Sequence, residues 1–291
     1  TRHVRNQVGP ALVARTDRTA SLDEALEAHR ERISKRHRVR NAEQLVGLID
    51  ALGFCFAFTR AEGLPIPACF DHLSTNDESR KWGWMWGWKD ELAEEKRVSY
   101  GPLLARKPTF VSMRWLPTFY ATVGRAGEPD DHLEDVRAGR LSDIGRRIIE
   151  LLAQRGESQT RRMRAELGIT SKEGKGQYGK ALDDVQRLMY VARVRAVGEG
   201  REEYNYTYDL FTRRYPEVVT ASERISSGDA METLLVRAVE LAGGITERQV
   251  GKLFDWDEER LRRTIEHLAG GQRVARMQRG REAWLLLPGY A

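Results

Sequence analysis

The stretch that decides the fold is QYGKALDDVQRLMY, residues 177–190, followed directly by VARVRAVGEGREEYNYTYDL, residues 191–210. Apolar side chains recur at helical spacing in the first part: Tyr178, Leu182, Val185 and Met189. This spacing predicts an amphipathic helix. In the second part, two runs that look like strands flank the loop 198–202, which predicts a β-hairpin. A helix that leads into a hairpin is the second half of a winged helix, an elaborated helix-turn-helix.

The same plan occurs twice. Upstream of residue 177, one helix is predicted between a Ser142 cap and Gly156, and a shorter one over 158–167. In the second unit, roughly 80 residues later, helices are predicted over 230–242, 246–254 and 257–268 and hairpin strands over 273–277 and 283–287. We therefore expect an α+β protein that is mostly helical and contains tandem winged-helix modules, each a helix-turn-helix with a β-hairpin wing.

The rest of the chain suggests one further module and an arm. We expect a flexible arm over residues 1–20, an N-terminal α+β module with a tryptophan-rich segment over 21–136, winged helix 1 over 137–220 and winged helix 2 over 221–291. In the N-terminal module the predicted elements are helices after Ser21 and over 42–52 and 116–123, and strands over 54–59 and 106–112. The polar, acidic segment 124–135 is read as a boundary loop, and 215–228 as a linker.

Composition excludes several classes of protein. The chain has 291 residues, of which 41% are hydrophobic and 31% charged, so a packed core is expected. No apolar run is long enough for a membrane span, and the polar start predicts no secretory signal. The two cysteines, Cys55 and Cys69, are too few for a disulfide scaffold and are expected to be buried. We expect a cytoplasmic protein, associated with the nucleoid if it binds DNA.

Charge is unevenly distributed along the chain. The net charge is +5 overall, +5 over residues 1–40, −5 over 41–136, +5 over 137–220 and zero over 221–291. A basic winged helix suits a polyanion, so double-stranded DNA is the predicted partner. The predicted DNA-binding residues are Lys172, Lys175, Gln177, Lys180, Arg187, Arg193, Arg195 and Arg201. The lysines and arginines are expected to contact phosphates, and Gln177 a base edge.

The second unit also has arginines on its third helix and wing, namely Arg260, Arg262, Arg263, Arg276, Arg279 and Arg281. Its third helix starts with Asp257, Glu258 and Glu259, which would repel DNA entering at that end. One winged helix is therefore expected to bind DNA, while the other either binds DNA or serves as an interaction or scaffolding module.

A second unusual feature is WGWMWGW, residues 82–88, in which tryptophans alternate with period two. The alternation predicts an extended segment. Trp84, Trp86 and Trp88 are candidates for stacking on an extruded base, or they seal a core or an interface. Asp90 and Glu91 follow Lys89 and are candidate catalytic carboxylates for a glycosylase; alternatively they belong to the solvated first turn of a helix over 89–96. No metal-binding motif is found, and no cofactor is expected.

Several stretches together resemble a known family: GFCFAF at 53–58, LPIP at 64–67, WGWKDEL at 86–92, LLARKPT at 103–109 and LPTFYA at 116–121. They resemble the AlkZ-related family of bacterial tandem winged-helix DNA-binding proteins, relatives of the AlkZ-like DNA glycosylases. The resemblance implies three winged-helix modules and binding to duplex DNA. The glycosylases carry a Gln-hydrophobic-Gln catalytic motif, whereas here Gln7 and Gln44 stand alone, so no catalytic residue is carried over.

Three functions are open at this point. The first is a duplex-DNA-binding protein in DNA repair, damage recognition or regulation. The second is a DNA glycosylase that excises alkylated or crosslinked bases. The third is a scaffold that binds proteins and does not contact DNA. The sequence leaves the oligomeric state open.

Overall fold

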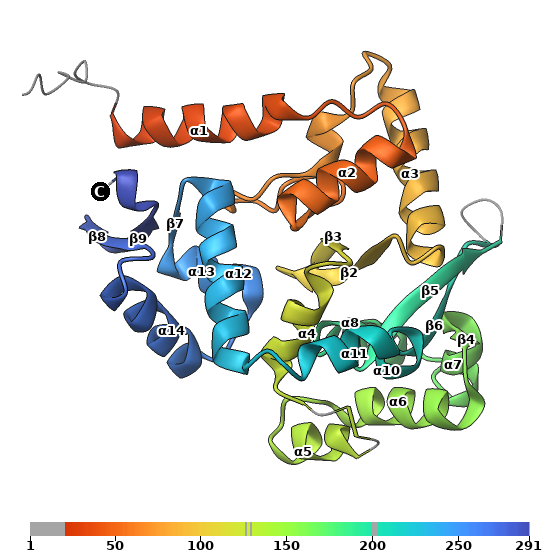
Figure 1. Ribbon diagram of the computed structural model, residues 1–291. Helices are drawn as coiled ribbons and strands as arrows, with labels where there is room; N and C mark the ends of the chain where they lie inside the picture. Colours follow the sequence, from red (N-terminus) through yellow and green to blue (C-terminus); the bar gives the residue numbers. More distant parts are fainter. Residues whose placement is uncertain (1–20, 126, 129, 199–202, 291) are drawn as a thin grey trace, which may run out of the picture.

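The computed structural model describes residues 21–125, 127, 128, 130–198 and 203–290. The predicted arm over 1–20 and the hairpin tip with Arg201 lie outside these residues. Figure 1 shows three small sheets surrounded by helices. The predicted fold class, a mostly helical α+β protein with small hairpin sheets, is confirmed.

The three sheets share one topology, with strand orders β1-β3-β2, β4-β6-β5 and β7-β9-β8. In each sheet, a short strand pairs in antiparallel fashion with the second strand of the following hairpin. The N-terminal part therefore has the same sheet topology as the two predicted repeats, although a short 3-10 helix, η1 (Cys69–His72), stands where the repeats have their second α-helix. Its elements are α2 (Ala42–Leu52), β1 (Phe54–Phe56), α3 (Glu78–Glu94), β2 (Val98–Leu104) and β3 (Lys107–Ser112).

The middle module matches the predicted plan closely. Its elements are α6 (Asp143–Arg155), β4 (Ser158–Gln159), α7 (Thr160–Glu166), α8 (Lys172–Arg187), β5 (Val191–Val197) and β6 (Asn205–Leu210). Helix α8 begins five residues before the predicted start, since the Ser171 side chain accepts a hydrogen bond from the Gly174 amide and caps the helix there.

The C-terminal module repeats this order. Its elements are α12 (Ser227–Ala242), β7 (Gly244–Thr246), α13 (Glu247–Phe254), α14 (Glu258–Gly270), β8 (Ala275–Arg279) and β9 (Glu282–Leu286). The remaining elements are α1 (Leu22–Arg36), η1 (Cys69–His72), α4 (Leu116–Val123), α5 (Asp131–Arg137), α10 (Phe211–Arg214), α11 (Pro216–Ser222) and η2 (Pro288–Tyr290). The predicted boundary loop thus contains part of α5, and the predicted linker contains α11.

Two separate hydrophobic cores hold the molecule together. The N-terminal and C-terminal modules share one core, in which α4 packs against α12. The middle module has a core of its own between α6, α7 and α8. Cys55 and Cys69 are buried in the shared core, as predicted, with their Sγ atoms 3.0 Å apart. The first and third modules are therefore one packed body, to which the middle module is joined.

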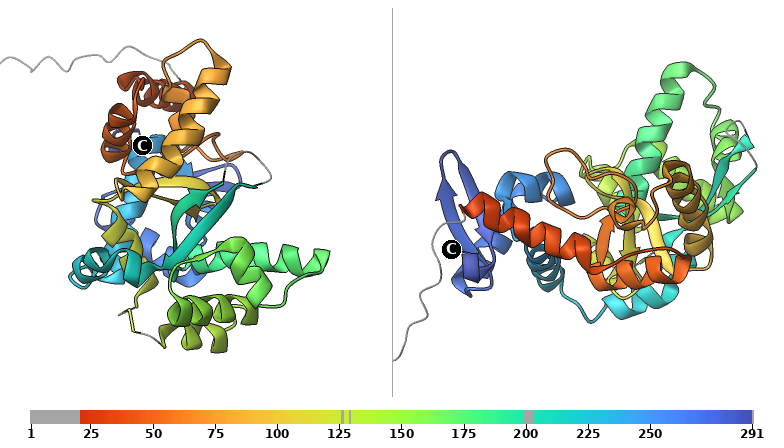
Figure 2. Two further views of the ribbon diagram at one scale, coloured as in Figure 1. Left: turned by 90° about the vertical axis from the view of Figure 1, so that its right-hand side faces the viewer. Right: turned by 90° about the horizontal axis from the view of Figure 1, so that it is seen from above.

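Three helices at the edges of the molecule, α1, α3 and α8, differ in how much of their surface packs against other modules. Helix α1 crosses to the C-terminal module (Figure 1), where His29 Nε2 lies 2.7 Å from the Glu240 carbonyl oxygen and Arg279 pairs with Asp23 at 2.6 Å. Helix α3 lies along one side of the molecule. In both views of Figure 2, one end of a green helix of the middle module projects from the body. The exposed residues of α8 are concentrated in its first turns.

The end of α2 depends on a glycine. Gly53 has φ +81°, and a Cβ atom there would lie 2.8 Å from Cε2 of the Trp115 ring. We expect Gly53→Ala to lower the free energy of unfolding by about 2 kcal/mol, because both the backbone and the ring must move. Gly47 lies in the same helix with open space around it, so Gly47→Ala should raise the same quantity by about 1 kcal/mol. Urea denaturation of the two variants measures both effects, and equal effects would contradict this assignment.

Candidate nucleic-acid interface and a buried lysine cluster

The tryptophan segment is helical, so the predicted extended conformation is wrong. The Asp77 side chain accepts a hydrogen bond from the Arg80 amide and starts α3, which continues without interruption through the tryptophans. A period-two pattern over seven residues also contains two pairs at i, i+4, and such pairs share one side of a helix. Met85, Lys89 and Leu92 supply the buried stripe of α3.

The four tryptophans form two pairs on opposite sides of this buried stripe. Trp84 and Trp88 are half-buried and stack on each other with ring centroids 5.2 Å apart. Trp82 packs on the Phe58 and Phe70 rings. Trp86 is 51% exposed and leans on Tyr204 at 5.3 Å. Of the three predicted stacking residues, Trp86 therefore has the most accessible ring.

Below Trp86 lies a fully buried lysine. The side chain of Lys89 is 1% exposed, and its Nζ donates to the Asp90 carboxylate at 2.7 Å, to the Tyr206 hydroxyl at 3.1 Å and to the Tyr204 hydroxyl. Tyr204 in turn donates to Asp90 Oδ2 at 2.5 Å. A buried ammonium is tolerated only when its charge and its protons are matched. We call Lys89, Asp90, Tyr204 and Tyr206 the Lys89 cluster.

A second cation extends this cluster into the sheet. The Arg193 guanidinium lies 3.7 Å from the Tyr206 ring centroid and 4.7 Å from that of Tyr100. The Lys89 ammonium also lies 4.3 Å from the Trp86 ring. Cations over aromatic faces are attracted by the ring quadrupole. These contacts join α3 and β2 to β5 and β6, and so attach the middle module to the shared body.

The chemistry open to the Lys89 cluster is limited by its hydrogen bonds. A nucleophilic amine needs a free lone pair, whereas Lys89 donates to three acceptors. Burial and the neighbouring Asp90 and Tyr206 groups raise the pKa of the Tyr204 hydroxyl, which keeps it a donor. Asp90 is 19% exposed and remains the carboxylate within reach of an outside ligand. Glu91 is exposed on α3 and is not part of this cluster.

Tyr204 and Tyr206 were not predicted as site residues. A signal for them was present, because the tyrosines of YNYTY alternate and so lie on one face of a strand. Nothing in the sequence places that face against Lys89, which is more than a hundred residues away.

The predicted DNA-binding residues separate into two groups. Lys172, Lys175, Gln177 and Lys180 are all exposed on the first half of α8. Within the described part of the chain, no carboxylate lies within ion-pair distance of these three lysines. Gln177 lies 3.5 Å from Glu173.

The remaining predicted cations that the structure describes are engaged inside the protein. Arg187 pairs with Asp184 at 3.3 Å and with Asp255 of the C-terminal module. Arg195 pairs with Glu157, and Arg193 lies among the tyrosines. These contacts argue against Arg187 and Arg193 as phosphate ligands.

Two glycines give α8 an unusual exposed surface. A Cβ atom at Gly176 or Gly179 would have nothing within 4 Å, so the fold itself leaves room for a side chain at both positions. Lys175 precedes Gly179 by four residues and Lys180 follows Gly176 by four, so the lysines flank the glycines on one face. We call Lys172, Lys175, Gly176, Gly179 and Lys180 the α8 face. Its bare backbone lies between ammonium groups and can be approached closely.

The equivalent helix of the C-terminal module is electrostatically different. On α14, Arg262 pairs with Glu259 at 2.8 Å and with Glu266 at 2.7 Å, and Arg263 pairs with Glu259 at 2.8 Å. Arg260 donates to the Thr122 carbonyl oxygen at 2.8 Å, at the junction with α4. Carboxylates on the same helix therefore neutralise most of the positive charge of α14, whereas the lysines of α8 are not neutralised in this way.

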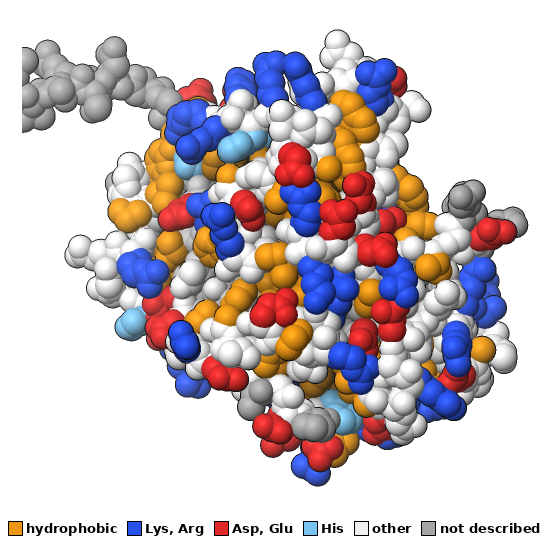
Figure 3. Space-filling model, turned by 45° about the vertical axis from the view of Figure 1, so that its right-hand side comes forward, with side chains coloured by type: hydrophobic (Ala, Val, Ile, Leu, Met, Phe, Trp, Pro, Cys, Tyr) orange, Lys and Arg blue, Asp and Glu red, His pale blue; other side chains and the backbone are white. Residues whose placement is uncertain are grey.

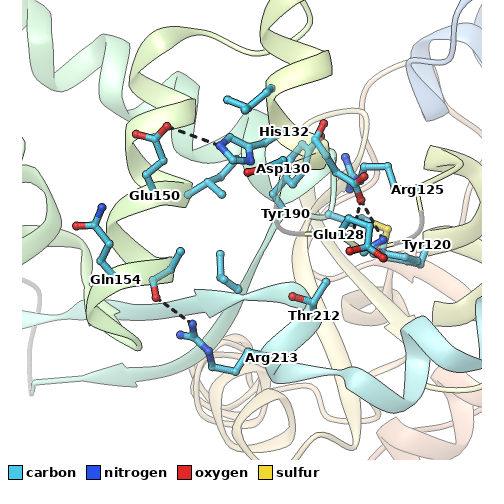
Figure 4. Close-up of a pocket in the computed structure, with 17 residues that line it drawn as sticks. Tyr120, Arg125, Glu128, Asp130, His132, Glu150, Gln154, Tyr190, Thr212 and Arg213 are labelled. Carbon is cyan, nitrogen blue, oxygen red and sulfur yellow. Dashed lines mark hydrogen bonds and ion pairs between the residues drawn. The ribbon is translucent and has the colours of Figure 1, made fainter.

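A cavity of about 470 Å³ lies apart from these residues, between α5, α6 and the end of β6 (Figure 4). Several of its polar side chains are engaged with other residues of the chain. Glu150 pairs with Arg146 at 2.7 Å and lies 3.7 Å from His132, and Tyr190 donates to Asp135 at 2.7 Å. None of the predicted site residues lines this cavity.

The described residues offer neither a metal site nor a membrane span. Among them, no three His, Cys, Asp or Glu side chains are grouped so that they could hold a metal ion. In the same part of the chain, no helix is long and apolar enough to cross a membrane.

The Lys89 cluster makes a prediction about stability. Lys89→Met should lower the free energy of unfolding by about 3 kcal/mol, because it leaves Asp90 and two tyrosine hydroxyls without their buried donor. Lys107→Met, at an exposed position of β3, should change it by less than about 0.5 kcal/mol. Denaturation curves of the two variants make the comparison, and a stable Lys89→Met protein would contradict the role of this cluster as a joint.

Comparisons with known proteins agree with this architecture. No curated protein matches the chain in sequence. Among solved structures, the chain is similar to the Streptomyces sahachiroi DNA glycosylase AlkZ, with a TM-score of 0.53 and 10% sequence identity over 90% of this chain and 68% of that one. At this identity the likeness concerns the fold. The family model described as AlkZ related matches residues 39–255, which is most of the chain, and the protein therefore belongs to the AlkZ-related family.

Proposed function

We propose that this protein binds duplex DNA in a DNA-repair context, with the α8 face as its main contact to the phosphate backbone. The α8 face carries this proposal, because it combines lysines that lack carboxylate partners among the described residues with a helix backbone left bare by Gly176 and Gly179. Membership of the AlkZ-related family and a fold like that of a DNA glycosylase support the repair context.

The geometry of α8 suits the major groove. Its first turns are the exposed part of the helix and carry the lysines. The third helix of a winged helix is narrow enough to enter this groove. Lysine contacts to phosphates position the protein, and they release counterions that make the affinity fall as salt rises. Gln177 is exposed beside the α8 face, on the same turns of the helix, and can read a base edge.

The test replaces two lysines of the α8 face. In Lys175→Ala/Lys180→Ala, the affinity for a fluorescent duplex should fall roughly tenfold or more at low salt, and the slope of log affinity against log salt should become shallower by about 1.8, at about 0.9 per lost phosphate contact. Anisotropy titrations at several salt concentrations measure both quantities.

The matched control is Arg262→Ala/Arg263→Ala, which removes two cations from the equivalent helix α14. These arginines are paired with Glu259 and Glu266, so the affinity and the salt slope should stay close to those of the unsubstituted protein. If the two double variants lose affinity equally, or if the α8 variant loses none, the proposed α8 contact is wrong.

A second candidate function is excision of alkylated or crosslinked bases. The observation that favours it is a carboxylate, Asp90, at 19% exposure below the accessible ring of Trp86. In this function Trp86 stacks on the extruded base, and the carboxylate stabilises positive charge that develops on the sugar as the base leaves. The absence of a Gln-hydrophobic-Gln motif makes Asp90 the residue to test.

The assay incubates the protein with duplexes that contain N-alkylated purines or a crosslink and measures the abasic sites formed. If excision occurs, Asp90→Asn should reduce its rate at least about a hundredfold, and Glu94→Gln, one turn further along α3, should not change it. Excision that persists in Asp90→Asn would show that Asp90 is not required for the reaction. If no lesion is released by the unsubstituted protein, the binding function stands without catalysis.

A further inference from the structure

The core of the N-terminal module holds two cysteine thiols in contact. Cys55 lies on β1 and Cys69 begins η1, and both side chains are 0% exposed. Their Sγ atoms are 3.0 Å apart. Even carbon atoms, which are smaller than sulfur, lie about 3.5–4.0 Å apart in ordinary non-bonded contacts. The two sulfurs are therefore closer than packing alone would place them, and a movement of about 1 Å would bring them to the length of a disulfide bond, about 2.05 Å.

The backbone around the cysteines keeps the two thiols together. The Phe56 amide donates to the Pro67 carbonyl oxygen at 2.9 Å, and Phe56 pairs with Ala68 in a parallel bridge. Strand β1 is held in turn by its pairing with β3 in the sheet. Both ends of the loop 57–68 are thus fixed beside each other without a covalent link. The fold itself presents the two sulfurs to one another, which is the geometric requirement for a disulfide.

The loop 57–68 makes contacts with two parts of the molecule. Phe58 stacks on the Trp82 ring of α3, with the ring centroids 5.6 Å apart. Further along the loop, the Gly63 carbonyl oxygen accepts a hydrogen bond from Gln249 Nε2, on α13 of the C-terminal module, at 2.6 Å. A covalent link across the base of the loop would hold both contacts in place.

We propose that Cys55 and Cys69 form an intramolecular disulfide when the protein meets hydrogen peroxide or a small-molecule disulfide, and that this bond clamps the loop 57–68. With hydrogen peroxide, each thiol gives up one proton and one electron as the S–S bond forms, and the O–O bond breaks to give two molecules of water. With a small disulfide, exchange through a mixed disulfide forms the same bond and releases two small thiols. A reducing compartment keeps the pair as a dithiol.

Burial makes this reaction slow in the closed structure. The thiolate is the reacting form of cysteine, and burial raises the pKa of the Cys69 thiol. Neither cysteine contributes to the surface, which on the face shown in Figure 3 is a mixture of charged, polar and apolar side chains. We therefore expect oxidation to proceed through a local opening of the loop 57–68. The equilibrium, rather than the rate, measures how strongly the fold favours the bond.

A redox titration measures this equilibrium. The full chain is equilibrated with mixtures of oxidised and reduced glutathione, starting from the reduced and from the oxidised protein, in the absence and in the presence of denaturing urea. Free thiols are then alkylated and the intact mass is measured, because the disulfide form lacks two hydrogen atoms and takes up no alkyl group. The equilibrium constant for the disulfide should be at least about tenfold larger in the folded protein than in the unfolded one, since the fold has already closed the loop.

A peptide map identifies which thiols are joined. Arg60 lies between the two cysteines, so trypsin produces the neighbouring peptides 41–60 and 61–80, each with one cysteine. Without reductant, the oxidised protein should give these two peptides joined to one another. Oxidation should also raise the thermal midpoint of the protein by several degrees. In the control, Cys69→Ala, the same treatment should give no joined pair and should not raise the midpoint.

Three results would overturn the proposal. The first is an equilibrium constant in the folded protein that is equal to or smaller than that of the unfolded protein. The second is a mixed disulfide with glutathione as the end product, and the third is a pair of identical peptides joined to each other, which indicates a bond between two chains. The outcome is independent of the proposed DNA contact, because the cysteines and the α8 face lie in different modules.

Discussion

The buried Lys89 ammonium constrains how the middle module docks on the N-terminal one. Lys89 lies in α3 of the N-terminal module. Its hydrogen-bond acceptors are Asp90 on the same helix, Tyr206 on β6 of the middle module, and Tyr204 just before β6. Taking an ammonium out of water costs several kcal/mol unless opposite charge and hydrogen bonds replace the water. Here Asp90, Tyr204 and Tyr206 together replace the water around the ammonium. One side chain therefore ties the buried stripe of α3 to the tyrosine face of β6.

This joint differs from the contact between the first and third modules. Those two share a hydrophobic core, in which α4 and α12 bury apolar surface without a directional requirement. The middle module also places apolar side chains in this core, among them Met189, Phe211 and Tyr215. In addition, it meets the shared body through oriented groups: the Lys89 cluster, Arg193 among tyrosines, and the chain of ion pairs that runs through Arg106, Asp184 and Arg187 to Asp255. Polar joints fix orientation more strongly than apolar ones do, because a small rotation breaks several hydrogen bonds at once. The consequence is a middle module held at a defined angle, with the first turns of α8 left exposed.

Local patterns in the sequence predicted much of the fold. The caps at Ser21, Asn41 and Ser142 and the helical spacing after Gln177 led to elements close to those observed. These patterns failed at the tryptophans, because seven alternating residues fit both a strand and two i, i+4 pairs of a helix. The residues that favour the helix are Asp77, which caps it, and Leu92, which extends its buried stripe, and both lie outside the alternating segment. The strand β2 was also missed, since its residues are buried almost throughout and show no alternation. The Lys89 cluster could not be predicted, because a contact between residues 89 and 204 depends on how two modules dock.

Helices α8 and α14 show why a fold alone does not assign a function. The two helices occupy equivalent places in modules of the same topology, and both carry several cations. On α14, Arg262 and Arg263 lie three or four residues from Glu259 and Glu266, and they form ion pairs with these glutamates within the helix. On α8, Gly176 lies four residues from both Lys172 and Lys180, and Gly179 lies four residues after Lys175, so these positions carry neither a competing charge nor a bulky side chain. Asp184, four residues after Lys180, pairs with Arg106 and Arg187 instead. A phosphate approaching α14 must displace a carboxylate, whereas a phosphate approaching α8 displaces only water and counterions. The sequence difference that separates the two modules is therefore the residue beside each cation rather than the number of cations.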